Sequence, residues 1–453
     1  MSKVAASYNA CDADLNTDGK ADVFDYAMLS DKFFTTDPAT DINNDGTVNV
    51  LDFSILVNHI FQACALPSPT PTPVPTLSPS PSPSPATSPT PTPSPSATPQ
   101  PQTGIWISPA ELAALPTSGP VWDNVKEWAD KSNALPDFSI SDDAFQNDDT
   151  NVIYMAKALV AARTGDATYR NQVMAGLQAI VDSDPEDYNF RALGLGRELG
   201  AYVIAADLID LKSTNPTLDQ AFRTKLEFLR YVPVPGGPDH LVECSDMCPN
   251  NWGGHCTFSR IVIALYLNDQ VDYQKAVKVY KGWLGDRSAY AGFDYGELSW
   301  QCFPSTPVGI NPKNNCSIQG HNLSGAQPEQ RRREQASFTW PPQYSGYEWE
   351  GLQGPYATAV VLSRNGYPDV WQWSDQALLR AVMWNYSGTP GYSGYGFPSD
   401  PGSQMNYPVN GSNSTNDDTW LPHLVNKYYG TTLPTLLARP GKNVGFTDWT
   451  HGQ

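Results

Sequence analysis

The chain has 453 residues and a formal net charge of −19 at neutral pH, with 17% charged and 40% hydrophobic residues. This length is enough for two or three domains with a large core, and the acidity makes nucleic acid and anionic membranes poor partners. No run of about 18 apolar residues is present, so the sequence predicts no membrane insertion.

Residues 1–64 contain two copies of one acidic pattern, DLNTDGKADVFD (14–25) and DINNDGTVNVLD (41–52). Each copy places oxygen-bearing side chains at the loop positions that bind calcium and a glycine at the sharp turn between them. The sequence therefore predicts two structural Ca²⁺ ions. The expected ligands are Asp14, Asn16, Asp18, Asp22 and Asp25 in the first loop and Asp41, Asn43, Asp45, Asn49 and Asp52 in the second.

Residues 9–64 resemble a type I dockerin. The resemblance rests on the duplicated loop, on Asp rather than Glu at its last position, and on the apolar segments 23–34 and 50–61 that follow each copy. It implies a small all-α tandem EF-hand-like module whose partner is a cohesin domain of a scaffolding or cell-surface protein. The pairs that would set cohesin specificity are both apolar, Val23-Phe24 and Val50-Leu51.

Residues 65–104 are almost entirely Pro, Ser and Thr, without any charge. Such a segment cannot bury apolar surface and is expected to form an extended, polyproline-like linker. It divides the chain into a module of residues 1–64, the linker, and a large domain of residues 105–453. The ten Asp and three Lys of the module give it a charge of −7, which leaves −12 for the rest.

Seven cysteines and the long linker predict a secreted, extracellular protein. Cys11 and Cys64 bracket the module and are expected to join its ends. Five more lie in the large domain, where we expect disulfides with one thiol left over. A zinc site at Cys244 and Cys248 is the alternative, although a convincing second ligand pair is missing. The five are Cys244, Cys248, Cys256, Cys302 and Cys316.

Amphipathic segments follow one another from residue 105 onward, and strands are hard to find. Ser108 and Glu111 have capping-box spacing with Pro109 between them, and Gly165 closes an apolar helical face that begins at Val152. We expect further helices over 197–211, 218–232, 273–286, 350–366 and 374–386. The pattern predicts a mainly α fold, an incomplete α/α toroid, with a loosely packed helical bundle as the alternative.

The loops between residues 283 and 349 are dense in Trp, Tyr and Phe. Aromatic faces stack well on sugar rings, so these residues are candidates for a carbohydrate groove, although several of them are equally expected in the core.

The segment NNWGGH (250–255) joins two amides and an imidazole without a carboxylate. Hydrolysis of a glycoside needs two carboxyl groups, whereas β-elimination on a uronic acid needs groups that neutralise the substrate carboxylate and stabilise an enolate. Asn, His and Arg can do this without a metal, while a Tyr or His removes the proton and a Tyr protonates the leaving oxygen. The segment therefore favours elimination.

Residues 105–453 resemble the alginate lyase superfamily. The resemblance rests on NNWGGH, on RELGAYVIAADLID (197–210) and on the basic and aromatic segment 329–354. It implies a helical toroid that cleaves a 1,4-linked polyuronate. In that family a histidine directly follows the asparagines, whereas here Trp252 stands in that position and His255 comes three residues later.

The resemblance assigns catalytic roles to Asn251, His255, Arg333 and Tyr347, with Arg332 as the alternative arginine and Tyr344 or Tyr295 as alternative tyrosines. Further candidates for substrate binding are Asn250, Trp252, Arg197, His321, Arg332, Trp340, Trp349 and Tyr295, with Lys442 a weaker one.

The predicted function is a polysaccharide lyase, with glucuronan as the first substrate and alginate as the second. Each residue also has a simpler explanation: Asn251 could cap a helix, His255 could be structural, His321 could lie on the surface, and residues 331–333 could form a solvated patch. The rivals are a glycoside hydrolase that uses Glu348, Glu350 or Glu297, with Asp294 also available, and a carbohydrate-binding protein without catalysis.

Overall fold

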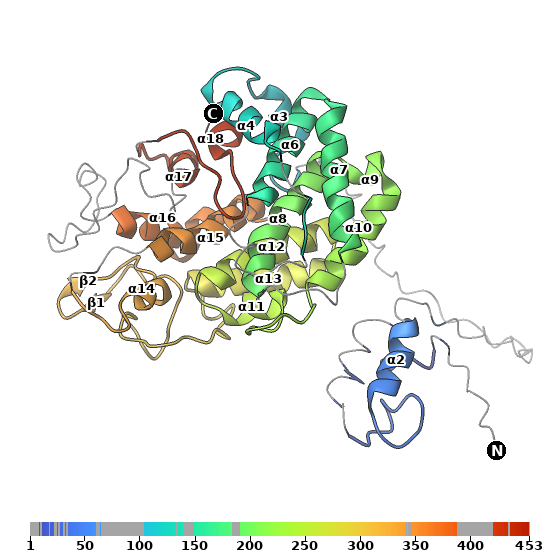
Figure 1. The fold of residues 1–453 in the computed structure, drawn as a ribbon. Coiled ribbons are helices and arrows are strands. Elements are labelled where there is room, and N and C mark those ends of the chain that lie inside the picture. Colours follow the sequence, from blue (N-terminus) through green and yellow to red (C-terminus); the bar gives the residue numbers. More distant parts are fainter. Residues whose placement is uncertain are drawn as a thin grey trace, which may run out of the picture. The chain divides into compact units, whose positions relative to one another are not determined.

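The structure of the protein is a computed structural model, and it is mainly helical, as the sequence predicts (Figure 1). The chain divides into two compact units, residues 1–94 and 95–453. The described residues are 9, 11–17, 19–21, 25, 28–29, 32, 35–59, 64, 104–132, 135–138, 149–183, 191–340, 342, 346–386, 420–433 and 435–452. None of the helices in these ranges is long and apolar enough to cross a membrane.

The two acidic loops of the first unit have matching backbones. Gly19 and Gly46 have φ angles of +96° and +95°, a conformation that other residues rarely adopt. Their amides donate to the carboxylates of Asp14 and Asp41 over 2.9 and 2.8 Å. Each loop therefore turns at its glycine, as the repeat predicts, and the glycine amide donates to the first aspartate of the loop.

A small core and one disulfide hold the first unit together. Helix α2 (Val50–His59) follows the second loop, in agreement with the helix expected over 50–61. Cys11 and Cys64 form the predicted disulfide, with their Cα atoms 4.6 Å apart. The buried apolar residues are Ala13, Ala21, Leu29, Ile42, Val48 and Leu56.

The large unit begins with a helix whose start the sequence encodes fully. In α3 (Pro109–Ala114) the Ser108 hydroxyl accepts from the Glu111 amide, and the Glu111 carboxylate accepts from the Ser108 amide over 2.9 Å. Both free donors at the helix start are thus satisfied by a capping box. Helix α4 (Pro120–Asp130) follows.

The next helices are joined mostly by short connections. Gly165 adopts a left-handed conformation at the end of α6, where the sequence predicts the helix to close. These helices are α6 (Thr150–Thr164), α7 (Ala167–Asp182), α8 (Ala192–Leu208), α9 (Leu211–Thr214), α10 (Pro216–Leu229), α11 (Leu241–Met247), α12 (Asn251–Leu267) and α13 (Gln270–Leu284).

An irregular region follows α13 and contains the two strands. They pair antiparallel, with Ile318 opposite His321. The remaining elements are β1 (Ser317–Ile318), β2 (His321–Asn322), α14 (Pro328–Glu334), α15 (Gly346–Arg364), the 3₁₀ turn η2 (Val370–Gln372), α16 (Trp373–Tyr386), α17 (Leu421–Tyr429) and α18 (Thr447–Thr450). Within α16, residues 374–376 have left-handed backbone angles, so regular helix begins after them.

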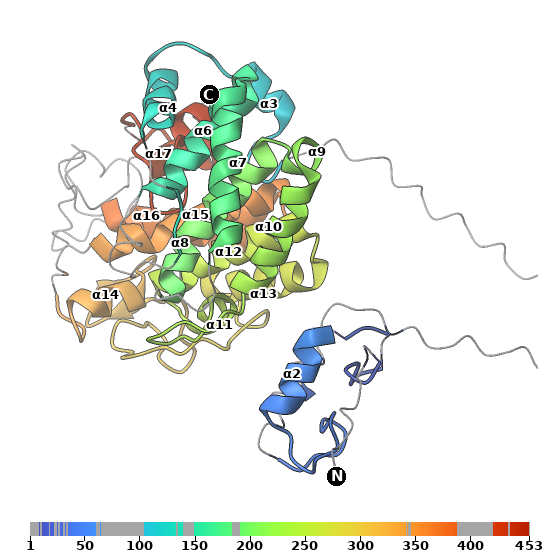
Figure 2. The same ribbon diagram turned by 45° about the vertical axis from the view of Figure 1, so that its right-hand side comes forward.

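Helix α12 is the centre of the large unit. It packs against α8, α11, α13 and α15 (Figure 1 and Figure 2), and nearly all of its side chains are buried. Its contact with α15 is unusually close because a Cβ atom at Gly354 would meet the Gly254 carbonyl, and one at Gly254 would lie 2.9 Å from the Pro355 ring. The two backbones therefore touch within the NNWGGH segment, at Gly254.

The cysteines of the large unit differ from the expectation of one unpaired thiol. Cys302 and Cys316 form a disulfide beside Trp300 and Trp384. The other three, Cys244, Cys248 and Cys256, are unpaired, and Cys244 and Cys256 are buried. The Cys256 thiol donates to the Ala192 carbonyl over 3.3 Å.

Candidate functional site

The two adjacent asparagines at the start of α12 have different environments. Asn250 is the helix cap, because its side-chain oxygen accepts from the Trp252 amide over 3.0 Å. Asn251, with 2% of its surface exposed, is left to bridge two charged groups. Its oxygen accepts from the Arg333 guanidinium over 2.5 Å, and its nitrogen donates to the Glu350 carboxylate over 3.0 Å.

Glu350 lies at the meeting point of three elements. On α15, its carboxylate accepts from the Asn251 amide and forms an ion pair with Arg197 of α8. His255 Nε2, one turn into α12, lies 3.6 Å from the same carboxylate oxygen. About a fifth of the Glu350 side chain is exposed, at 19%, whereas the Arg197 side chain is 7% exposed.

His255 is fully enclosed behind Glu350. Its side chain is 0% exposed, and its Nδ1 is hydrogen-bonded to the side-chain oxygen of Asn443. Burial, and then the positive charge of Arg197, hold the pKa of His255 well below its ordinary value. The imidazole is therefore neutral at neutral pH, and it contacts other protein groups rather than solvent.

The solvent side of the cluster is formed by Arg333, Tyr347 and Glu350. Arg333 is exposed, and its guanidinium lies over the half-buried Tyr347 ring, 4.2 Å from the ring centre. Tyr347 and Glu350 are three residues apart on α15 and so share a helix face. The site has two layers: an outer layer of these three residues and an inner layer of Asn251, Arg197 and His255.

The neighbouring arginines do not form a solvated patch. Arg331 is fully buried and pairs with the equally buried Glu348 over 2.7 Å. Arg332 pairs with Glu329 over 2.5 Å, so only Arg333 of this run reaches Asn251. The structure thus distinguishes between the two arginines that the sequence leaves as alternatives.

The predicted carbohydrate-binding aromatics are dispersed. The His321 and Trp340 rings stack with their centres 4.0 Å apart, and both are partly exposed. Tyr295 is partly buried and contacts Phe293, whereas Trp252 is partly buried with the Arg191 guanidinium over its ring.

Trp349 is a core residue rather than a surface contact. Its side chain is 1% exposed and packs edge-on against Tyr386, with ring centres 4.9 Å apart. The structure therefore does not place it where a substrate could touch it. Tyr344, the alternative catalytic tyrosine, lies outside the described residues.

A second hydrogen bond occurs at equivalent positions in the two calcium loops. The Asn16 amide donates to Asp25, and the Asn43 amide donates to Asp52, each over 2.9 Å. The first and last acidic residues of each loop are thus drawn toward its centre, and their oxygens suit Ca²⁺. In the part of the chain that the structure describes, no three His, Cys, Asp or Glu side chains are gathered as a metal site. The expected ligands Asp18 and Asp22 are not among those residues.

Two buried amides complete the cluster, and the sequence analysis missed both. Asn443 donates to the Gly196 carbonyl over 2.9 Å while its oxygen faces His255. Asn151 donates to the carbonyls of Arg197 and Lys442 over 3.1 and 2.8 Å. Together they bind the segment near the C-terminus to α8 behind the site.

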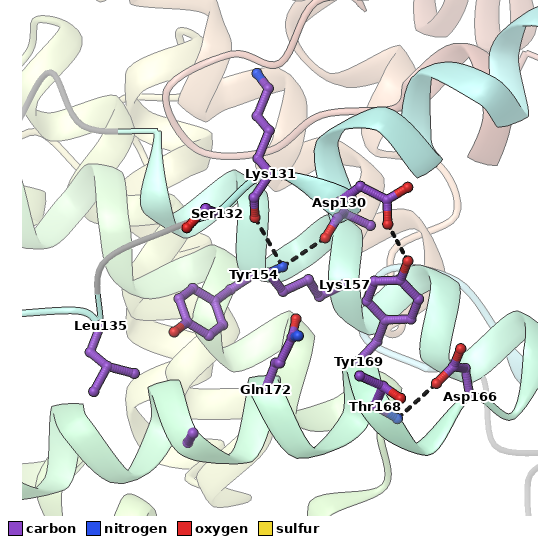
Figure 3. A pocket seen from close by; sticks show the side chains of 12 residues that line it. Asp130, Lys131, Ser132, Leu135, Tyr154, Lys157, Asp166, Thr168, Tyr169 and Gln172 are labelled. Carbon is purple, nitrogen blue, oxygen red and sulfur yellow. Dashed lines mark hydrogen bonds between the residues drawn. The ribbon is translucent and has the colours of Figure 1, made fainter.

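The surface hollow between α4, α6 and α7 has a volume of about 610 Å³ and includes none of the predicted site residues (Figure 3). At its floor the Lys157 amine donates to the carbonyls of Ala129 and Lys131 over 2.6 and 3.2 Å, and the Tyr169 hydroxyl donates to Asp130. Lys157 therefore satisfies carbonyls at the end of α4, which is a structural role.

A scan of the sequence against models of known protein families found no match, and a search of curated proteins found no relative.

Proposed function

We propose that the large unit is a polysaccharide lyase that cleaves a 1,4-linked polyuronate by metal-independent β-elimination. One observation carries the proposal: Asn251, Arg333 and Tyr347, which come from three different helices, lie in one cluster around Glu350. Glucuronan is the first candidate substrate and alginate the second.

The charge of the cluster suits one carboxylate. Arg197 and Arg333 are positive, Glu350 is negative, and His255 is held neutral. One positive charge remains, and the charge of Lys442 acts on the same imidazole. In a chain of net charge −19, this local excess is what a polyanionic substrate requires.

The outer layer supplies groups for two parts of the reaction. Arg333 binds the uronate carboxylate and stabilises the negative charge that develops there when the adjacent carbon loses its proton. Asn251 fixes the guanidinium, since its oxygen accepts from Arg333. Tyr347, under the same guanidinium, donates its hydroxyl proton to the glycosidic oxygen as the carbon–oxygen bond breaks.

The positions of the carboxylates argue against hydrolysis as the rival function. A glycosidase needs two carboxyl groups on either side of the scissile bond. Glu348 is fully buried in its pair with Arg331 and also accepts from the Trp384 indole over 3.1 Å. Glu297 is exposed and held by the Ser299 hydroxyl over 2.6 Å. Glu350 is the one of these three glutamates that belongs to the cluster.

The finer architecture is part of the same proposal. Successive helices packed around α12 support an incomplete α/α toroid, and the matching loops at Gly19 and Gly46 support a dockerin that holds two Ca²⁺ ions. We further propose that the protein is secreted and that the dockerin attaches it to a cohesin domain.

The deciding experiment incubates the full chain with glucuronan, polymannuronate, polyguluronate and pectate, with and without a chelator. Elimination creates a carbon–carbon double bond conjugated to the carboxylate, which absorbs in the near ultraviolet. We expect a chelator-resistant rise in absorbance on one polymer, and no rise with Tyr347→Phe. New reducing ends without this absorbance would mean hydrolysis, and binding without any product would mean a carbohydrate-binding protein.

A further inference from the structure

The orientation of the Asn443 side chain is fixed by its surroundings. Its nitrogen faces two backbone carbonyls, those of Gly196 at 2.9 Å and Arg197 at 3.4 Å. Carbonyls only accept hydrogen bonds, so the NH₂ group must be on this side. The Asn443 oxygen is then the atom that faces His255 Nδ1.

This orientation determines where His255 carries its proton. The Asn443 oxygen can only accept, so Nδ1 must be the protonated nitrogen. A neutral imidazole has one N–H, which leaves Nε2 with a bare lone pair. Nε2 has no hydrogen-bond partner among the described residues, and it faces a Glu350 oxygen at 3.6 Å. Two acceptors therefore face each other, and one proton between them would satisfy both.

We propose that Asn443 is a positioning residue that keeps His255 in the Nδ1–H form, so that His255 Nε2 and the Glu350 carboxylate act together as the site's proton acceptor. Glu350 is the partly exposed end of this pair and His255 is its enclosed end.

The catalytic part of this inference rests on the proposed lyase function. In the elimination, the carbon–hydrogen bond beside the substrate carboxylate breaks and its proton moves to Glu350. The electron pair left on that carbon forms the new double bond as the bond to the leaving oxygen breaks, and that oxygen takes the hydroxyl proton of Tyr347. The proton then passes from Glu350 to His255 Nε2, which leaves a carboxylate beside an imidazolium.

The charges around His255 come from three elements. Arg197 on α8 and Lys442 beside Asn443 disfavour the imidazolium, whereas Glu350 on α15 favours it. Because these groups oppose one another, the proton is shared by the pair rather than held permanently by His255. The activity should therefore rise with pH as the pair loses its proton.

The test measures which nitrogen of His255 is protonated in the full chain. The protein is labelled with ¹⁵N-histidine, and two-bond ¹H–¹⁵N correlations are recorded at neutral pH. The chain has six histidines, so the signal of His255 is identified by its loss in His255→Gln. We expect Nδ1–H in the wild type. In Asn443→Leu the acceptor is gone, and the proton should move to Nε2, where it can bond Glu350.

Asn151→Ala is the matched control, because Asn151 binds the same Arg197 carbonyl but does not contact His255. It should keep Nδ1–H. Asn443→Asp keeps an acceptor and should also retain the Nδ1 proton. A wild-type His255 protonated on Nε2 would overturn the inference even if Asn443→Leu failed to fold, and so would an unchanged tautomer in Asn443→Leu.

The activity measurement separates the two proposals. If the lyase is confirmed, Asn443→Leu should lower kcat by about 100-fold or more, the usual contribution of a positioned base, and shift the pH profile, with little change in KM. If Asn443→Leu changes the tautomer of His255 but leaves the pH profile unchanged, His255 and Glu350 do not act together as the proton acceptor, while the lyase function still stands. No elimination by the wild type, with Nδ1–H observed, would reject the lyase alone.

Discussion

Arg333 on α14 and Asn251 on α12 are joined by one hydrogen bond of 2.5 Å, although they are 82 residues apart in the chain. The same asparagine donates to Glu350 over 3.0 Å. A single buried amide thus lies between a guanidinium and a carboxylate and sets the distance between them.

Replacing Arg333 with Ala should remove most of the activity. The guanidinium is the exposed positive group of the cluster, and loss of one such donor at a developing negative charge lowers kcat by about 100-fold or more. Arg332→Ala is the matched control because Arg332 pairs with Glu329. Steady-state kinetics on the best polyuronate would distinguish them, and equal losses in both variants would contradict the assignment.

Asn250→Ala and Asn251→Ala should affect different properties. Asn250 caps α12, so its loss should lower the free energy of unfolding by about 1 kcal/mol with activity retained. Loss of Asn251 leaves Arg333 and Glu350 without their shared partner, and activity should fall with it. Urea unfolding measures the stability of each variant, and the absorbance assay measures its activity. An equal loss of activity in Asn250→Ala and Asn251→Ala would contradict the assignment of Asn251 to the site.

Replacing Glu348 should mainly lower stability, whereas replacing Glu350 should mainly lower activity. Removing one partner of a fully buried ion pair costs about 3–5 kcal/mol, so Glu348→Ala should strongly destabilise the large unit by stranding Arg331. Glu350→Gln keeps the side-chain volume at a partly exposed position and should abolish activity with a smaller loss of stability. A stable Glu348→Ala protein that lacks activity would instead support the hydrolase.

His451 should make stability depend on pH. Burial, with the charges of Lys427 and Arg364, lowers its pKa from 6.5 to about 3. Between these values the unfolded chain binds a proton that the folded chain does not, so stability is full above about pH 6.5 and falls as the pH is lowered. The loss approaches about 1.4 kcal/mol per pH unit. Urea midpoints between about pH 5 and 6.5 should fall for the wild type as the pH is lowered. The fall should be smaller in His451→Asn, where His255, whose pKa is also held well below its ordinary value, still contributes.

The first unit should bind two Ca²⁺ ions per chain. Calorimetric titration of the chelator-treated full chain should give this stoichiometry, because both loops present the same oxygens. Asp41→Ala should reduce it to one ion without changing the activity of the large unit. Binding of one ion or none by the wild type would contradict the expected pair of sites.

Local patterns in the sequence were sufficient for helix ends and for part of the site. Ser108 with Glu111, and Gly165, act through neighbouring backbone atoms, so the sequence predicts them directly. The NNWGGH segment marked Asn251, but the sequence could not decide between Arg332 and Arg333. That choice depends on the direction in which each side chain leaves α14, which only the packing of α14 on α15 determines.

Other parts of the site have no local pattern. Asn443 lies 188 residues beyond His255, and no spacing connects them. Trp349 belongs to an aromatic-rich segment that predicts a groove, yet it faces Tyr386 in the core. Nothing in the sequence YEWEG (347–351) distinguishes Glu350 from Glu348. Its importance follows from three elements meeting at its carboxylate.

The glycines at 254 and 354 give the site an unusual vulnerability. They let the backbones of α12 and α15 touch, three residues from Asn251 and four from Glu350. A methyl group added at either position would clash with the facing helix and push the two helices apart where their polar side chains meet. Replacing Arg333 or Tyr347 should change the chemistry of the site but leave this helix contact intact, whereas the two glycine positions carry no chemistry and must stay as they are to keep it.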